Sequence, residues 1–317
     1  MSHALSLASV LDSCRRLSTD PVPVSRRPDR TTLLAFFGTV LIGGTNFIAV
    51  KFSNVELDPL YGAAVRFAGA CAILFVIARL RRYALPRGKA LIGSSIYGVL
   101  NFGIGYALLY IALLRLGAGT ASVIMATVPL ITLTLAVIHG QERFTARGIV
   151  GGLLAVCGIA VISIHSIGSE LPLTYVLVAL GGAFAVSESS VLLKSFPKSH
   201  PITTNAIGMA SGATFLTLAS LIGRETWVIP TLPKTWLVLV WLVLVGSVGL
   251  FTLFVYVIGR WTASASVYAL TLMPVVAITL GVILANETVT PKILAGGALV
   301  ICGVYVGALS QTRKKPA

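Results

Sequence analysis

The sequence predicts an all-α membrane protein in which ten transmembrane helices form two inverted five-helix repeats. Three observations support this fold class: the composition, the alternation of basic residues between apolar runs, and an internal repeat. Of the 317 residues, 56% are hydrophobic and 11% are charged, whereas soluble chains carry about 25% charged residues. The mean hydropathy is +0.94. The chain therefore has too little polar surface to enclose a soluble core.

The apolar runs have the length of membrane spans. A helix crosses a hydrocarbon core of about 30 Å with about 20 mainly apolar residues. Such runs recur along the chain, bounded by charged residues, Pro or Gly. In the first half they cover residues 32–50, 60–78, 91–113, 118–138 and 147–165. In the second half they cover residues 173–193, 203–222, 236–258, 263–284 and 292–310.

The basic residues alternate between the two sides of these spans. Positive residues are retained on the cytoplasmic side. Of the 24 Lys and Arg residues, eighteen fall on one side and Arg66 lies inside the second span. The other side holds five, namely Lys51, Arg115, Arg224, Lys234 and Lys292. Both termini are therefore expected in the cytoplasm, and the expected location is a bacterial inner (plasma) membrane.

The spans divide into two units between polar tails. Residues 1–30 form an expected disordered cytoplasmic tail without the apolar segment of a secretory signal. A transit peptide is the alternative, and Asp12, Asp20 and Asp29 argue against it. Residues 31–170 form the first five-helix unit, residues 171–310 the second, and residues 311–317 a basic cytoplasmic tail. The four cysteines lie far apart and indicate neither a disulfide framework nor a metal site.

An internal repeat relates the two units. Displacing the sequence by 145 residues aligns Ala112–Ile164 with Val257–Leu309 without a gap, and fifteen positions are identical. The matched pairs include Pro129 with Pro274 and Glu142 with Glu287. Five spans separate the copies, and an odd number of crossings turns the second copy upside down. Inverted repeats recur in secondary transporters, whose halves move about a central site.

Three stretches carry a family resemblance that covers nearly all of residues 31–310. They are "DPLYGAAVRF", "ALLRLGAGTASVIMATVPLITLTLAVIHGQERFTARGIVGGLLAVCGI" and "WTASASVYALTLMPVVAITLGVILANETVTPKILAGGALVICGV". In these stretches the chain resembles the drug/metabolite transporter (DMT) superfamily, and specifically its EamA-type transporters. The resemblance implies a ten-helix carrier with a central cavity. Substrates across that family include amino acids, other metabolites and drugs, and these motifs do not select among them.

Polar groups inside the spans are the candidate substrate or coupling residues, because they are costly in lipid and should face the bundle interior. The candidates are Asn46, Arg66, Tyr97, Asn101, Tyr106, Glu188, Thr252 and Tyr256. For Glu188 two interpretations remain open: a carboxyl that exchanges a proton during transport, or a carboxylate held by Arg66 or by neighbouring hydroxyls. Lys51 and Lys194, at equivalent span ends, are interpreted as lysines that extend to the membrane surface.

Prolines and glycines predict how the helices bend and pack. Pro129 and Pro274 each remove a backbone hydrogen bond within a span and predict a bend. Six glycines are predicted to let helices approach closely, either within one chain or between two: Gly151, Gly152, Gly158, Gly296, Gly297 and Gly303. Glu142 and Glu287 precede Thr145 and Thr290, which are predicted N-caps of the following helices.

The expected function is a secondary transporter that exports a small metabolite, either an amino acid or a drug-like amphiphile, by alternating access. Proton coupling is one option. A nucleotide-sugar or phosphorylated-sugar antiporter of the same superfamily is the alternative. A channel is permitted by the repeat. An intramembrane enzyme is disfavoured because no span holds an HExxH or GxSxG motif.

No cofactor, metal, catalytic residue or nucleic-acid partner is expected. The chain contains no GxxxxGK[ST] loop, so ATP is not the expected energy source. The expected partners are the lipid bilayer, a small-molecule substrate and, under the coupled option, protons. The oligomeric state is left open.

Overall fold

The computed structural model describes residues 29–141, 146–167, 173–260 and 263–306, and no strand occurs within these ranges. The first half contains α2 (Arg30–Ser53), α3 (Pro59–Leu80), α4 (Lys89–Gly98), the π-helical η1 (Val99–Gly105), α5 (Tyr106–Ala112), α6 (Ala118–Met125), α7 (Val128–Ile138) and α8 (Ala146–Ile167). The second half contains α9 (Leu173–Leu193), α10 (Pro201–Ile222), α11 (Pro233–Val243), the π-helical η2 (Leu244–Gly249), α12 (Leu250–Arg260), α13 (Ala263–Ala285) and α14 (Pro291–Val304).

Within the described residues, each predicted span overlaps one helix or a run of consecutive helices. Within the described ranges, seven helices or runs are long and apolar enough to cross a membrane. The apolar helical stretches Ala146–Val161, Ala269–Ala285 and Pro291–Val304 are shorter. They overlap the fifth, ninth and tenth predicted spans, and each extends one residue beyond its span.

Capping side chains and prolines fix where several helices begin. The carboxylate of Asp29 accepts a hydrogen bond from the Thr32 N–H at 2.9 Å and caps α2. The hydroxyl of Thr290 accepts from the Ile293 N–H at 3.3 Å, so the predicted cap of α14 is confirmed. Proline also occupies the first turn of α3, α10, α11 and α14, where its missing N–H has no partner to lose. The predicted cap at Thr145 lies outside the described residues.

The π-helical segments lie at equivalent places in the two halves. Val99, the first residue of η1, and Leu244, the first residue of η2, are 145 residues apart, which is the displacement of the internal repeat. The runs α4–η1–α5 and α11–η2–α12 form the third and eighth predicted spans. Inserted π turns are rare and are often found at functional sites.

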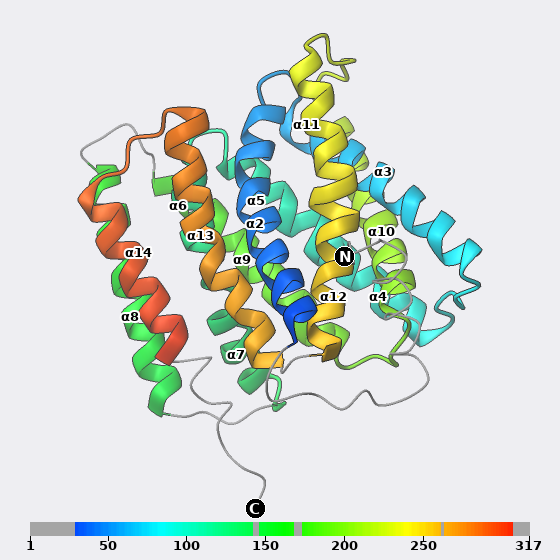
Figure 1. Cartoon of the computed structure of the whole chain (residues 1–317), viewed down its shortest axis with the longest axis horizontal. Helices are drawn as coiled ribbons and strands as arrows, with labels where there is room; N and C mark the ends of the chain where they lie inside the picture. The colour runs from blue at the N-terminus through cyan, green and yellow to red at the C-terminus, as the bar shows by residue number, and fades with distance from the viewer. Residues whose placement is uncertain (1–28, 142–145, 168–172, 261–262, 307–317) are drawn as a thin grey trace, which may run out of the picture.

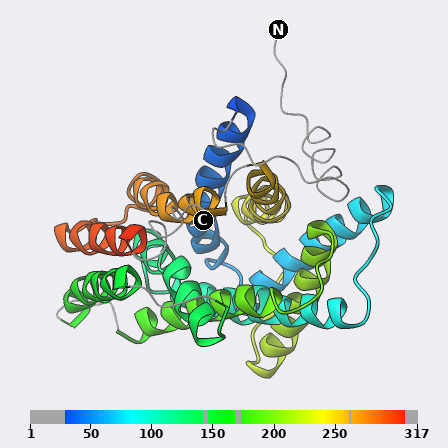
Figure 2. The same cartoon turned by 90° about the horizontal axis from the view of Figure 1, so that it is seen from below.

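Helices α8 and α14 lie side by side at one edge of the molecule (Figures 1 and 2). A Cβ on Gly158 would lie 2.6 Å from the carbonyl oxygen of Gly296, and one on Gly303 would lie 2.6 Å from that of Gly151. Because the higher residue number of each helix meets the lower one of the other, the helices are antiparallel. Gly158 and Gly303 are equivalent positions of the internal repeat, as are Gly151 and Gly296, so the repeat maps one contact onto the other.

The other two predicted packing glycines differ from these four. The place of a Cβ on Gly297 lies 3.4 Å from Cγ2 of Val123 in α6, which is ordinary van der Waals distance. Nothing lies within 4 Å of the corresponding place on Gly152. Gly152 therefore makes no close helix contact within the described chain, and packing between two chains stays a prediction for it.

The Gly158→Ala substitution is expected to destabilise the protein by about 1–3 kcal/mol, the usual cost of overpacking, because the new methyl group would meet backbone atoms of α14. Thermal unfolding in detergent measures the effect. Gly152→Ala is the matched control on the same helix and should leave the unfolding temperature unchanged or raise it. Equal destabilisation by both substitutions would contradict the contact described here.

Candidate functional site

An internal cavity of about 240 Å³ lies between the helices of the two halves. The candidates predicted from the sequence that line it are Asn46, Arg66, Tyr97, Asn101 and Tyr106. These residues come from α2, α3, α4, η1 and α5. Residues of α6, α7, α9, α12 and α13 also contribute to the wall. Within the described part of the chain, Arg66 is the one residue of the lining with a formal charge.

Three predicted candidates, Glu188, Thr252 and Tyr256, are not among the described lining residues. Helix phase explains this, because two residues correspond to about 200° around an α-helix. On α9 the cavity is lined by Val186 and Ser190, so Glu188 lies on the opposite face.

The same phase argument applies to α12, where Leu250 and Phe254 line the cavity. Thr252 donates to the carbonyl of Val248 within its own helix at 2.6 Å. Tyr256 is buried beside Ala35, Phe36 and Val40 of α2. The placement of these two residues in the cavity is therefore corrected.

Arg66 is completely buried, with 0% of its surface exposed. Its Nε–H donates to the hydroxyl of Ser247 at 2.9 Å, one terminal nitrogen donates to the carbonyl of Gly246 at 2.9 Å, and the other to the hydroxyl of Tyr110 at 3.4 Å. The guanidinium carbon lies 5.2 Å from the ring centres of Phe67 and Tyr106. All of these partners are uncharged.

None of the six carboxylates in the described ranges bonds to Arg66. Their recorded partners lie elsewhere, and Glu188 pairs with His139 at 3.2 Å rather than with the arginine. The interpretation in which Arg66 holds Glu188 is therefore wrong. A buried charge without a partner of opposite sign is costly in a protein interior and more so within a membrane.

Asn46 meets Arg66 at one carbonyl group. Its amide nitrogen donates to the Gly246 oxygen at 2.9 Å, the same oxygen that accepts from Arg66. Asn46 is 7% exposed, and its amide oxygen is buried without a hydrogen-bond partner in the described structure. A Cβ on residue 246 would lie 2.2 Å from that amide oxygen, so only glycine allows this approach.

Gly246 and Ser247 were not predicted from the sequence. Both belong to η2, and Gly246 occupies the repeat position of Asn101 in η1, 145 residues earlier. Asn101 of η1 lines the cavity, and η2 lies behind the lining, where the Gly246 carbonyl accepts from Asn46 and Arg66.

The remaining described wall of the cavity is largely apolar. Tyr97 and Asn101 add a small polar group, in which the amide of Asn101 donates to the Tyr97 hydroxyl at 3.0 Å. Ser122 of α6 also lines the cavity. The apolar lining residues include Met125, Leu250, Phe251, Phe254, Leu270 and Met273.

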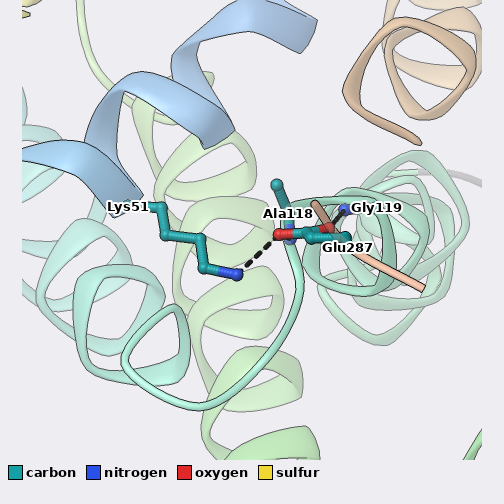
Figure 3. Close-up of polar contacts among 4 residues, drawn as sticks. All are labelled: Lys51, Ala118, Gly119 and Glu287. Carbon is teal, nitrogen blue, oxygen red and sulfur yellow. Dashed lines mark hydrogen bonds and ion pairs between the residues drawn. The ribbon is translucent and has the colours of Figure 1, made fainter. Parts of the chain in front are cut away.

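An ion pair joins three helices at one end of the bundle (Figure 3). The ammonium group of Lys51, near the end of α2, lies 2.7 Å from a carboxylate oxygen of Glu287, which follows α13. The same carboxylate accepts from the backbone N–H groups of Ala118 at 2.8 Å and Gly119 at 3.5 Å. Glu287 therefore caps the N-terminus of α6, where a negative charge is favoured.

The sequence makes room for this carboxylate. A Cβ on Gly117 or Gly281 would lie 2.8 Å or 2.6 Å from a Glu287 oxygen. Asn286 turns the chain with a φ of 50°, a left-handed conformation that asparagine tolerates. Lys51, interpreted from the sequence as a lysine that extends to the membrane surface, has a specific partner in Glu287. A second cavity of about 910 Å³, also lined by Arg115, lies beside this ion pair.

At the opposite end of the bundle, α7 and α9 are tied together. His139, the C-cap of α7, bonds to Glu188 of α9, and the amide of Gln141 donates to the carbonyl of Val191 at 3.2 Å.

The two repeat-related prolines have different places in their helices. Pro129 lies in the first turn of α7, just after the helix is interrupted between α6 and α7, whereas Pro274 lies inside the uninterrupted helix α13. No group of three or more potential metal ligands occurs among the described residues.

Glu56, in the connection between α2 and α3, ties that loop to the start of α11. Its carboxylate accepts from the hydroxyls of Thr231 and Thr235 and from the N–H groups of Thr231 and Leu232. These hydrogen bonds, first those of the two hydroxyls, lower the pKa of Glu56 from 4.5 to about 2.

A model of the EamA-like transporter family matches the chain twice, over residues 30–164 and 173–308. An uncharacterized transporter of Archaeoglobus fulgidus is 32% identical over 286 residues, covering 84% of this chain and 95% of the relative. The uncharacterized inner membrane transporter YedA of Escherichia coli K12 is 27% identical over 275 residues, covering 86% and 89%.

A Salmonella typhimurium protein named "Probable amino-acid metabolite efflux pump" is 25% identical over 291 residues, covering 88% of this chain and 95% of the relative. A solved crystal structure resembles the fold with a TM-score of 0.63 at 19% identity, covering 91% of this chain and all of the other. At that identity the likeness concerns the fold alone.

Glu56→Gln is expected to lower the unfolding temperature at pH 7, because the carboxylate accepts four hydrogen bonds as an anion. A depressed pKa means that this stabilisation is fully present above pH 4.5 and is lost as the pH falls towards about 2. The difference in unfolding temperature between the two proteins should therefore close over that interval. Leu232→Ala, which keeps its backbone donor, is the control and should retain the pH dependence of the wild type. A difference independent of pH would contradict this account.

Proposed function

The chain belongs to the EamA-like transporter family, and from this premise we propose that it is a ten-span secondary transporter that exports a small metabolite by alternating access. It is a multi-pass membrane protein, and its relatives are named as transporters. The observation that carries the proposal is the central cavity, whose walls come from equivalent elements of both halves.

The inverted arrangement of the two halves is supported by two independent features. The fifth helix of each half, α8 and α14, runs antiparallel to the other and meets it through equivalent glycines. The basic residues concentrate on the side that would hold both termini, which we propose to be the cytoplasmic side of a bacterial inner membrane. Within the described ranges, seven helices or runs have the length and apolar character of spans, and three shorter apolar helices would provide the other three crossings that the proposal requires.

The cavity favours a small substrate. Its volume of about 240 Å³ is below the range of about 300–1,000 Å³ in which drug-sized ligands bind. A nucleotide sugar or a sugar phosphate would bring at least two negative charges, whereas Arg66 is the single charged group of the described lining. The name of the Salmonella relative, an amino-acid metabolite efflux pump, agrees with a small metabolite as cargo.

The Lys51–Glu287 pair is the proposed outer latch. The charge count places both residues on the outer side, where they join α2 of one half to α13 of the other. Export would require these helices to separate, which breaks the ion pair and re-forms it on return. A proton-coupled version of this mechanism would use the His139–Glu188 pair at the other end, because only a protonated histidine holds the carboxylate as an ion pair.

Comparative metabolomics of the medium tests the export function. Cells that overproduce the wild-type chain should accumulate at least one metabolite outside, and cells that produce Met125→Trp at the same level should not, because the indole would fill the cavity. Leu34→Trp, at a residue 61% exposed on α2, is the control and should export like the wild type. Identical media from wild-type and Met125→Trp cells would refute the proposal. Saturable counter-transport of the identified metabolite in vesicles separates a carrier from a channel.

The latch is tested by the accessibility of the cavity from outside. In a chain whose native cysteines are serines, Ser122→Cys places a thiol in the cavity wall for an impermeant maleimide. Adding Lys51→Gln should raise the labelling rate about fivefold, since a partly exposed ion pair contributes about 1 kcal/mol. Lys292→Gln removes an outer lysine that is not recorded as a partner of Glu287 and should leave the rate unchanged. Labelling of the Lys51→Gln protein at the unchanged rate would exclude the latch.

A further inference from the structure

We propose that His139 and Glu188 form a proton-binding site, which holds one proton while the inner end of the bundle is closed and releases it when that end opens. The pair joins α7 of the first half to α9 of the second, with 3.2 Å between Nε2 of the histidine and Oε1 of the glutamate. The bound proton follows from hydrogen-bond chemistry. Its release on opening rests on the proposed function, because alternating access supplies the opening.

The imidazole of His139 lies between two hydrogen-bond acceptors. Its Nδ1 is 2.9 Å from the carbonyl oxygen of Leu135, and its Nε2 is 3.2 Å from the Glu188 oxygen. A backbone carbonyl oxygen only accepts, so Nδ1 carries a hydrogen. A neutral imidazole has one N–H, which would leave the lone pair of Nε2 facing a carboxylate oxygen. The contact therefore needs one further proton, either on Nε2 as imidazolium or on Glu188 as a carboxylic acid that donates to Nε2.

Within the described residues, His139 is the one recorded partner of the Glu188 carboxyl group. The hydroxyls beside it are engaged, since Ser187, Ser189 and Ser190 each donate to a backbone carbonyl. The Oε2 atom of Glu188 is buried without a hydrogen-bond partner in this part of the chain. A buried carboxylate oxygen without a donor is costly. The site therefore favours the state in which the pair holds a proton over the state with a bare carboxylate and a neutral imidazole.

The other titratable or charged groups around α7 and α9 have no recorded contact with this pair. On the described parts of the elements packed against the two helices, and on α9 itself with the turn that follows it, they are Lys89, Tyr97, Tyr106, Tyr110, Arg147, Cys157, Tyr175 and Lys194. Arg147 and Lys194 are exposed. The side chains of Glu142, Arg143 and His165 lie outside the described residues. No recorded charge thus replaces the proton as the link between the two side chains.

The position of the pair couples its proton to the opening of one end. The charge count assigns this end to the cytoplasm, and opening it separates α7 from α9, which belong to different halves. The N–H bond of Nε2 then gives up its proton to water and leaves a neutral imidazole and a carboxylate. Because the closed state binds one more proton, low cytoplasmic pH favours the closed end and high pH favours the open end.

Thermal unfolding of the purified protein tests for the bound proton. Glu188→Gln and His139→Gln each place an amide N–H where the proton lies, so both variants keep a bond between α7 and α9 that does not titrate. As the pH rises above about 6.5, where a free histidine is neutral, the wild type should lose stability relative to both variants. Gln141→Leu, which removes a non-titrating bond between the same helices, is the control and should lower the unfolding temperature equally at every pH.

Labelling from the cytoplasmic side tests the link to opening. In inside-out vesicles, an impermeant maleimide reaches the Ser122→Cys thiol of the cavity wall only when the inner end is open. The labelling rate is divided at each pH by that of the same reporter with Glu188→Gln, so that the titration of the thiol itself cancels. This ratio should rise about fivefold with pH, the effect of a partly exposed ion pair. With Gln141→Leu the rate should be higher at every pH and keep the same pH dependence.

A stability difference from both amide variants that stays constant with pH would overturn the inference as a whole. A pH-dependent difference in stability together with a constant labelling ratio would overturn the link between the proton and opening. These outcomes are distinct from failure of the proposed function. Export of a metabolite by a protein without either pH effect would remove the proton site and leave transport standing. Both pH effects in a protein that exports nothing would do the reverse.

Discussion

A single buried positive charge organises the centre of this molecule. Arg66 is enclosed by α3, α5 and the π-helical η2, and the groups that touch it are hydroxyl, carbonyl and aromatic groups. Such a charge is tolerated in a membrane protein only where the surrounding structure is built around it. The π turn of η2 exposes the Gly246 carbonyl and the Ser247 hydroxyl to the guanidinium. The absence of a side chain at Gly246 lets Asn46 approach the same point.

The two ends of the bundle are held by different chemistry. At one end a lysine and a glutamate form an ion pair that also caps a helix. At the other end a histidine–glutamate pair and a glutamine join α7 to α9. The central cavity lies between them, so a conformational change that opens one end has a defined set of polar contacts to break. The polar contacts that join the helices thus differ between the two ends.

The sequence predicted the helices well because the bilayer imposes a strong rule. Within the described residues the predicted spans overlap the helices, and the rule that ionisable and amide groups avoid lipid selected Arg66, Asn46 and Asn101. The sequence did not predict which face of each helix points into the cavity, nor did it predict the two π-helical segments. Glu188 was chosen for its charge, but Val186 and Ser190 define the cavity face of α9 and leave it on the far side. Gly246 and Ser247 gave no signal, because small neutral residues are common in spans and matter here only through the π turn that contains them.

The paired glycine contacts between α8 and α14 have an evolutionary consequence. Position 158 of the first half meets position 296 of the second, and position 303 of the second meets position 151 of the first. When 145 is subtracted from the residue numbers of the second half, both contacts join positions 151 and 158, as in the self-complementary patch of a two-fold symmetric dimer. One ancestral gene encoding a single half would therefore already specify both sides of this interface. Two oppositely inserted products of such a gene would satisfy it before any fusion joined them.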